Sequence, residues 1–330
     1  MLRKSIMELG LAEPLATLVR SRYNRARQNA SLTLTETQLA ILQLSDQSKH
    51  NFQLRYCPAL QKKPTQQKPE QTKDKKKFNP FEKPDTDLLI AEIPAGQATH
   101  SLVLNKYPII PNHFILATKD FAEQTDLLET QDLAMTYSVL RAWEGQNPDG
   151  KLFAFFNSGP ESGASQPHRH LQFVPFEDMQ RDVPQDQFWH PLVSGQPDGV
   201  ADKLSSSPLP ELPFETQQVR LPVDISATQL HSVYVNLVKK HVGLDGKRPT
   251  GSYNLGMTSR NIAIAPRTNE AYVHKNSKGE DAVIAVNGTI LAGTLMVKGQ
   301  DGWDWLRNDP SALRKVLSRL GVIKESANHL

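Results

Sequence analysis

Two histidines and a glutamine alternate along one short stretch of the sequence, His168-Arg169-His170-Leu171-Gln172. On a β-strand, side chains two residues apart share a face, so His168, His170 and Gln172 would project together while Arg169 and Leu171 point the other way. A neutral imidazole is a nucleophile near pH 7 and becomes a good leaving group once it carries phosphorus. The spacing therefore indicates nucleophilic chemistry on a phosphate.

A loop of small and polar residues, Asn157 to Pro167, is predicted directly before this strand. Gly163 permits a close approach of the backbone, and Ser165 adds a hydroxyl to the amide donors of the loop. These are the components of an anion-binding turn. A nucleophile beside such a turn is typical of a chemical site and less so of a packing motif.

Metal binding and a purely structural role are the two other interpretations of the histidines. A His-x-His pair is often a zinc site, and a single strand histidine is often a hydrogen-bonded core residue. Zinc needs at least one further ligand, and the only cysteine, Cys57, is far from the pair in sequence. We therefore expect no metal site built from protein side chains.

The composition is that of an ordinary globular chain, with 330 residues, 38% of them hydrophobic, and a net charge of +3. A single cysteine excludes an intramolecular disulfide and favours a reducing compartment. No run of 18 apolar residues occurs, which argues against a membrane span. We expect a cytoplasmic protein, with the nucleus as an alternative location.

The positive charge is concentrated in Gln61 to Lys77, which holds seven lysines and two acidic residues. A nucleic-acid binder spreads its positive charge over a folded face, so a solvated linker is the favoured interpretation and no nucleic-acid partner is expected. The predicted division of the chain has five parts. These are residues 1–60 with an N-terminal helix and first strand, the flexible linker 61–77, a catalytic core at 78–193, a loop at 194–215, and a C-terminal portion at 216–330 that completes the site.

The hydrophobic pattern predicts strands that occur in adjacent pairs as often as they alternate with helices. This favours an α+β fold built on an antiparallel sheet with flanking helices. Helices are expected over 11–29, from Thr130 to Gly145, over 228–242 and from Asp309 to Gly321. Strands are expected at 51–56, 101–104, 113–118, 151–156, 168–174, 252–257 and 262–265.

The stretch around His170 resembles the His-x-His-x-Gln signature of the transferase branch of the histidine-triad superfamily. Most of the chain is similar to one family, the fungal diadenosine tetraphosphate phosphorylases, also called ATP adenylyltransferases. The segments that carry this similarity are Pro58-Ala59-Leu60 with Lys63-Pro64, Asn79-Pro80-Phe81, Leu104 to Pro108 with Pro111 and His113, the signature and its loop, Tyr253-Asn254 to Pro266-Arg267, and Gly293 to Lys298.

The resemblance implies a histidine-triad-like fold and assigns roles to residues. His170 would be the nucleophile, Gln172 would bond the α-phosphate, and His168 would position groups and donate near the phosphate. The implied substrate-binding residues are Asn157, Gly163, Ala164, Ser165 and Gln166 for phosphate or ribose oxygens, and Lys63, Asn105, Lys106, Asn287 and Lys298 for the rest of the nucleotide. Structural alternatives remain for Lys63 in the linker, for Asn105 and Lys106 in a turn, and for Asn287.

The implied reaction is phosphorolysis of diadenosine tetraphosphate to ATP and ADP through an AMP-histidine intermediate. A magnesium ion would accompany the polyphosphate. Two rivals stay open, a hexose-1-phosphate uridylyltransferase with the same signature and a non-catalytic dinucleotide sensor. The chain departs from the family pattern at Gly256 and at Asn261-Ile262-Ala263, where larger apolar or aromatic residues are usual. The oligomeric state is not indicated.

Overall fold

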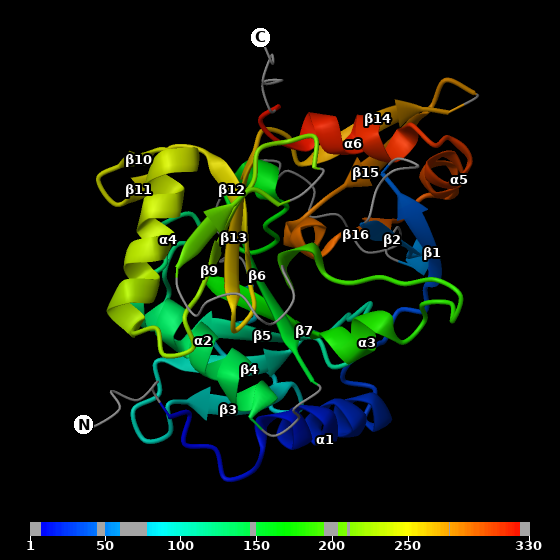
Figure 1. Cartoon of the computed structure of the whole chain (residues 1–330). Coiled ribbons are helices and arrows are strands. Elements are labelled where there is room, and N and C mark those ends of the chain that lie inside the picture. The colour runs from blue at the N-terminus through cyan, green and yellow to red at the C-terminus, as the bar shows by residue number, and fades with distance from the viewer. Residues whose placement is uncertain are drawn as a thin grey trace, which may run out of the picture.

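The computed structural model describes residues 8–44, 50–59, 78–145, 150–194, 204–209, 212–276 and 278–323 (Figure 1). The predicted linker 61–77 and the candidate residue Lys63 lie outside the described residues. The fold is α+β and is organised on a nine-stranded antiparallel sheet, which confirms the predicted class.

The large sheet has the strand order β3-β4-β5-β7-β6-β12-β13-β9-β8. Every neighbouring pair in it is antiparallel. The strands are β3 (Leu89–Ile93), β4 (His100–Leu104), β5 (Phe114–Thr118), β6 (Leu152–Ser158), β7 (His170–Pro175), β8 (Ser205–Ser207), β9 (Gln217–Arg220), β12 (Ser252–Met257) and β13 (Asn261–Arg267).

Three helices cover one face of this sheet, α1 (Leu15–Gln28), α2 (Thr130–Glu144) and α4 (Ala227–His241). They lie in the lower and left parts of Figure 1. The side chains of α4 and of the sheet share one apolar core, for example Tyr234 with Leu255. Local sequence fixes the start of α4, because Ser226 and Gln229 form a reciprocal capping box. The predicted helices over 11–29, 130–145 and 228–242 are confirmed.

A second apolar core forms on the opposite face, where a small sheet of order β1-β2-β16 packs with the C-terminal helices. β1 is antiparallel to β2, whereas β16 runs parallel to β2 and so pairs a C-terminal strand with an N-terminal one. The elements of this half are β1 (Gln38–Gln43), β2 (Asn51–Tyr56), α3 (Phe176–Gln180), β14 (Ala271–Lys275), β15 (Asp281–Ala285), β16 (Thr294–Val297), α5 (Gln300–Asn308) and α6 (Ala312–Leu320). A minor hairpin pairs β10 (Leu244–Asp245) with β11 (Arg248–Pro249).

Several boundaries differ from the prediction. β6 continues through Ser158, so Asn157 lies in a strand and not in the following loop. The reason is that β12 supplies a second neighbour, with Asn254 opposite Asn157, and this pairing extends β6 beyond the apolar run that the sequence displays. β8 forms within the predicted loop 194–215, and β1 was not predicted.

The strands of the large sheet come from both the predicted core 78–193 and the predicted C-terminal portion 216–330. The two portions therefore share one sheet, and the proposed division of the chain stays a prediction. Within the described ranges, no helix is long and apolar enough to cross a membrane.

A buried network of charged side chains connects Arg169, the residue just before β7, to α2. Arg169 Nη1 lies 2.9 Å from Asp132 Oδ2, and His100 Nε2 lies 3.0 Å from Asp132 Oδ1. Burial alone would raise the pKa of Asp132, but the hydrogen bond from His100 and the charge of Arg169 outweigh it and hold the pKa below its usual value. Because Arg169 is pulled toward α2, the neighbouring histidine side chains face the other way.

We predict that Asp132→Ala destabilises the fold strongly, because it leaves the Arg169 guanidinium buried without its carboxylate. Breaking a buried pair in this way costs about 3–5 kcal/mol, whereas breaking an exposed pair costs less than about 1 kcal/mol. Glu92→Ala is the matched control, since it removes the partly exposed ion pair with Lys119. Urea unfolding at pH 7 compares the two variants, and equal losses would contradict the prediction.

The same network predicts that the free energy of unfolding depends on pH. The folded-state pKa of Asp132 is depressed, so its contribution is complete above the unfolded pKa and is lost as the pH falls through the folded value. The stability difference between the wild type and Asp132→Ala should therefore shrink in acid.

Candidate active site

His170 opens β7 and is buried, with 3% of its surface exposed. Its Nδ1 lies 2.8 Å from the carbonyl oxygen of His168. A carbonyl oxygen can only accept, so Nδ1 carries the ring hydrogen and donates it. The lone pair is consequently on Nε2, and this nitrogen is the nucleophilic atom of the ring.

The environment keeps His170 neutral. Burial lowers the pKa of His170 to about 4, with the bond to the His168 carbonyl acting in the opposite direction and the His168 ring adding to the decrease. At neutral pH the ring is therefore unprotonated and retains the Nε2 lone pair.

His168 lies just before β7 and uses both ring nitrogens within the protein. Asn79 Nδ2 donates to Nδ1 over 2.8 Å, and Nε2–H donates to Thr118 Oγ1 over 2.9 Å. Burial lowers the pKa of His168. This arrangement supports the expected positioning role. It offers no ring hydrogen for the expected donation to phosphate, because Thr118 accepts the one that is available.

Two aromatic side chains border the histidines. The Phe81 ring centroid lies 5.0 Å from that of His170 and 5.7 Å from that of His168. Asn79 Oδ1 accepts from the Phe81 amide, and this hydrogen bond helps to hold the Phe81 ring beside the two histidines. On the other side, the largely exposed Phe121 lies 5.3 Å from His168. These apolar walls help explain the low pKa of both imidazoles.

Gln172 is oriented by a chain of hydrogen bonds. The Tyr107 amide donates to Asn105 Oδ1, and Asn105 Nδ2 donates to His113 Nδ1 over 3.1 Å. His113 must then carry its hydrogen on Nε2, which donates to Gln172 Oε1 over 3.0 Å. The Gln172 oxygen is thereby occupied, and its Nε2 has no acceptor among the described residues. The amide of Gln172 is held with its donor available.

The Asn105 side chain forms hydrogen bonds within the protein, and its contact with the nucleotide stays a prediction. The resemblance implied a contact with the nucleotide, but the Asn105 side chain bonds His113 and the Tyr107 amide. The turn that was the structural alternative for Asn105 is present, because its Oδ1 caps the backbone two residues on. Its influence on the site passes through His113 and Gln172.

The small-residue loop is anchored on the C-terminal half. Gly163 has a φ of +79°, and a Cβ there would lie 3.0 Å from both the Asn287 Cβ and the Val286 carbonyl oxygen. Only glycine accepts this conformation and this close approach without strain. Asn254 Nδ2 donates to the Ser162 carbonyl over 2.9 Å and further fixes the loop. The loop that the sequence predicts to bind an anion is thus packed against and bonded to the C-terminal half.

Asn157 lies at the centre of the same anchoring network. Its Oδ1 accepts from Asn254 Nδ2 over 2.9 Å and from the Gly288 amide over 2.8 Å. Arg267 in turn donates to Asn254 Oδ1 over 2.5 Å. With its oxygen occupied, Asn157 can meet a substrate only through its Nδ2.

The remaining candidate residues differ in their exposure and in their contacts with the site. Asn287 Oδ1 caps the short helix Gly288–Ala292 by accepting from the Thr289 amide and hydroxyl, which supports its structural alternative. Ser165 is exposed, and Ala164 and Gln166 are half-buried beside it. Lys106 and Lys298 are exposed, and within the described residues neither ammonium contacts the histidine strand.

Several functional candidates were not predicted from the residues alone. Asn79, Phe81 and His113 fall in segments that carried the family resemblance, so a signal for them was present. Thr118 and Gln124 had none, because their contacts with His168 and His170 join positions 46 or more residues apart.

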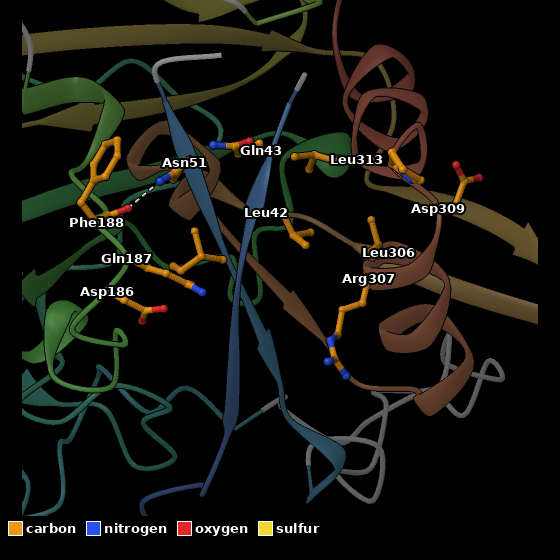
Figure 2. Close-up of a pocket in the computed structure, with 12 residues that line it drawn as sticks. Leu42, Gln43, Asn51, Asp186, Gln187, Phe188, Leu306, Arg307, Asp309 and Leu313 are labelled. Atoms are coloured by element: carbon orange, nitrogen blue, oxygen red, sulfur yellow. Dashed lines mark hydrogen bonds between the residues drawn. The ribbon is translucent and has the colours of Figure 1, made fainter. Parts of the chain in front are cut away.

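A hollow of about 460 Å³ lies away from this site. Figure 2 shows its lining from β1, α5, α6 and the segment around Phe188, where Asn51 donates to the Phe188 carbonyl. Neither His168 nor His170 lines it. Among the residues that the structure describes, no group of three or more His, Cys, Asp or Glu side chains is placed to hold a metal ion.

Family models match both halves of the chain. The model of the Ap4A phosphorylase N-terminal domain, where Ap4A is diadenosine tetraphosphate, matches residues 8–190, which is more than half of the chain. The model of the ATP adenylyltransferase C-terminal domain matches residues 210–323. The chain belongs to the Ap4A phosphorylase family. It is accordingly a nucleotidyltransferase.

Individual relatives of this family cover almost the whole chain. Diadenosine 5',5'''-P1,P4-tetraphosphate phosphorylase 2 of Saccharomyces cerevisiae is 28% identical over 94% of this chain and 95% of its own. Protein APA1 of the same yeast is 24% identical over 95% of this chain and 96% of its own. The crystal structure of yeast Ap4A phosphorylase Apa2 in complex with Ap4A is 25% identical, with a TM-score of 0.75 over 94% of this chain and 98% of that one.

We predict that the His170 ring of this Ap4A phosphorylase family member carries its hydrogen on Nδ1 and stays neutral down to a pH of about 4. An unperturbed histidine titrates near about 6.5. Nitrogen NMR of protein labelled in its histidines measures both properties, with His170→Gly identifying the signal. A hydrogen on Nε2, or a titration near the unperturbed value, would refute the proposed nucleophile.

We also predict that Asn105→Asp reverses the orientation of Gln172. A carboxylate cannot donate to His113 Nδ1, so the His113 hydrogen moves to Nδ1 and Gln172 must donate its own Nε2–H to His113. Loss of one donor to the transferred phosphate lowers kcat by about 10²–10³-fold. Two measurements test this prediction together, the kcat for nucleotide turnover and the His113 tautomer determined by NMR. Asn236→Asp, at an exposed position on α4, controls for the substitution itself, and an unchanged His113 tautomer would count against the relay.

Proposed function

We propose that this chain catalyses the phosphorolysis of diadenosine tetraphosphate by inorganic phosphate to ATP and ADP, through a covalent AMP adduct on His170. The observation that carries the proposal is the bond from His170 Nδ1–H to the His168 carbonyl. It leaves Nε2 as the basic nitrogen of a ring that is neutral at pH 7. Family membership and the relatives named for this reaction support the choice of substrate.

In the first step, Nε2 attacks the α-phosphorus of one adenosine. The Nε2–P bond forms, the bond from that phosphorus to its bridging oxygen breaks, and ATP departs with the electron pair. The ring gains positive charge as the bond forms. The His168 carbonyl, already bonded to Nδ1–H, stabilises that charge without moving.

In the second step, an oxygen of inorganic phosphate attacks the same phosphorus. The new P–O bond gives ADP, and the Nε2–P bond breaks and returns its electron pair to the ring. Because the ring is cationic while it carries the adenylyl group, it is a good leaving group. No external proton donor is needed in either step, which fits a His168 whose single ring hydrogen is already donated to Thr118.

Donors around the phosphorus would stabilise the negative charge on its oxygens. We assign Gln172 Nε2 to the α-phosphate, since its orientation is fixed and the described residues offer it no acceptor. The amides of the Gly163 to Gln166 loop and the Ser165 hydroxyl would serve the neighbouring oxygens. Lys63, Lys106 and Lys298 remain candidates for the distal phosphates.

A magnesium ion would arrive with the polyphosphate and offset part of its charge. The described residues offer no cluster of carboxylates for it, so the phosphate oxygens of the substrate would supply its ligands, and the steps above do not pass through the ion. We further propose the cytoplasm as the site of action, because a single cysteine favours a reducing compartment.

The proposal predicts equal amounts of ADP and ATP from diadenosine tetraphosphate and phosphate, measured by ion-exchange chromatography. With phosphate omitted, mass spectrometry of the quenched protein should find one AMP on His170. His170→Gly should abolish both signals, while His190→Gly, at an exposed histidine, should change neither.

Other outcomes would identify a different activity. Transfer of UMP to a hexose phosphate, without ADP formation, would indicate a uridylyltransferase. Binding of the dinucleotide with neither products nor adduct would indicate a sensor.

A further inference from the structure

The ladder between β6 and β7 stops beside the nucleophile. Its last pair is Phe155 with Gln172, although β6 continues to Ser158 and β7 begins at His170. Past that pair, β6 bonds only to β12 and β7 bonds only to β5. The two strands that flank the site therefore separate where His170 faces Asn157.

The side chain of Gln124 occupies this gap. Its Oε1 accepts from the His170 backbone amide over 2.8 Å, and its Nε2 donates to the carbonyls of His170 and Asn157 over 3.2 Å and 2.8 Å. One primary amide thus bonds three of the backbone groups that a continued ladder would pair. The backbone of the nucleophile is bonded through both its amide and its carbonyl to a single side chain.

Gln124 is itself held firmly. It is 2% exposed, and its backbone amide donates to the Pro167 carbonyl over 2.8 Å. One residue earlier, Glu123 forms a bridge with His168, and Arg169 donates to the Ala122 carbonyl over 2.8 Å. The segment that carries Gln124 therefore runs alongside residues 167–169 and is hydrogen-bonded to them.

We propose that Gln124 is a positioning residue that sets where His170 Nε2 lies, by bonding the backbones of β6 and β7 where the two strands separate at the nucleophile. Without the amide, the His170 N–H and the Asn157 carbonyl lose their partners in the protein interior, and the backbone shifts to pair them again, which displaces the ring. Gln124 does not touch the reacting atoms, so its effect is on the chemical step and not on substrate affinity. This inference rests on the proposed function.

The strongest variant is Gln124→Leu, which keeps the volume and removes all three bonds. A displacement of about 1 Å at a reacting group can slow a reaction by about 10²-fold. We expect adduct formation from diadenosine tetraphosphate, in single-turnover experiments without phosphate, to slow by about that factor. The dissociation constant for the dinucleotide should stay within about threefold of the wild type. Gln131→Leu is the matched control, because Gln131 is an exposed glutamine with one bond to Thr99.

Gln124→Glu gives a readout that loss of stability cannot imitate. An ionised carboxylate accepts from the His170 amide but repels both carbonyls, whereas the protonated carboxyl regains one donor. Burial raises the pKa of a carboxyl group, so the rate relative to wild type should recover as the pH is lowered toward about 5. The nucleophile remains neutral there, since the pKa of His170 is about 4.

The outcomes separate the two proposals. If folded Gln124→Leu forms the adduct at the wild-type rate, or if the Gln124→Glu ratio is flat with pH, the positioning role is overturned. If Gln124→Leu does not fold, the pH profile of Gln124→Glu decides alone. If the wild type forms no adduct, the proposed function fails instead. Hydrogen exchange of the His170 amide then still tests the bond to Gln124, with faster exchange expected in Gln124→Leu, which lacks the acceptor, and equal exchange opposing it.

Discussion

The hydrogen bond from His170 Nδ1–H to the carbonyl of His168 is the interaction on which the rest of the site depends. A backbone carbonyl has no alternative protonation state, so it selects one tautomer of the ring under all ordinary conditions. It also cannot be removed by changing a side chain. The nitrogen that we propose as the nucleophile is therefore specified by the local conformation of three consecutive residues, and the surrounding structure holds that conformation.

Both faces of this stretch are fixed by buried polar groups. On the helix side, Arg169 is fastened to Asp132 on α2. On the other side, His168 is bonded between Asn79 and Thr118. Such groups are costly to bury unless every one finds a partner, and satisfied networks of this kind hold one arrangement over others. The rigidity of the catalytic strand follows from these partners more than from its own ladder, which is interrupted beside β6.

The C-terminal half contributes to the site through its packing. β12 and β13 extend the large sheet. Hydrogen bonds from Arg267 to Asn254, and from Asn254 to Asn157 on β6 and to Ser162, connect them to the loop that follows β6. Burial lowers the pKa of Arg267 to about 10, which still leaves it charged near neutral pH. Gly163 packs directly on Asn287. The two halves matched by separate family models therefore form one structural unit at the site.

The sequence by itself determined the elements whose cause is local. Alternation predicted His168, His170 and Gln172 on one face, and apolar periodicity located three of the helices and gave an α+β fold of antiparallel strands. Only the tertiary structure decided what each polar group bonds. The parallel pairing of β2 with β16, the turning of Gln172 by His113 and the insertion of Gln124 beside His170 all join residues distant in the chain. No local pattern encodes them, because a hydrogen bond depends on where two groups meet in space and not on their separation along the sequence.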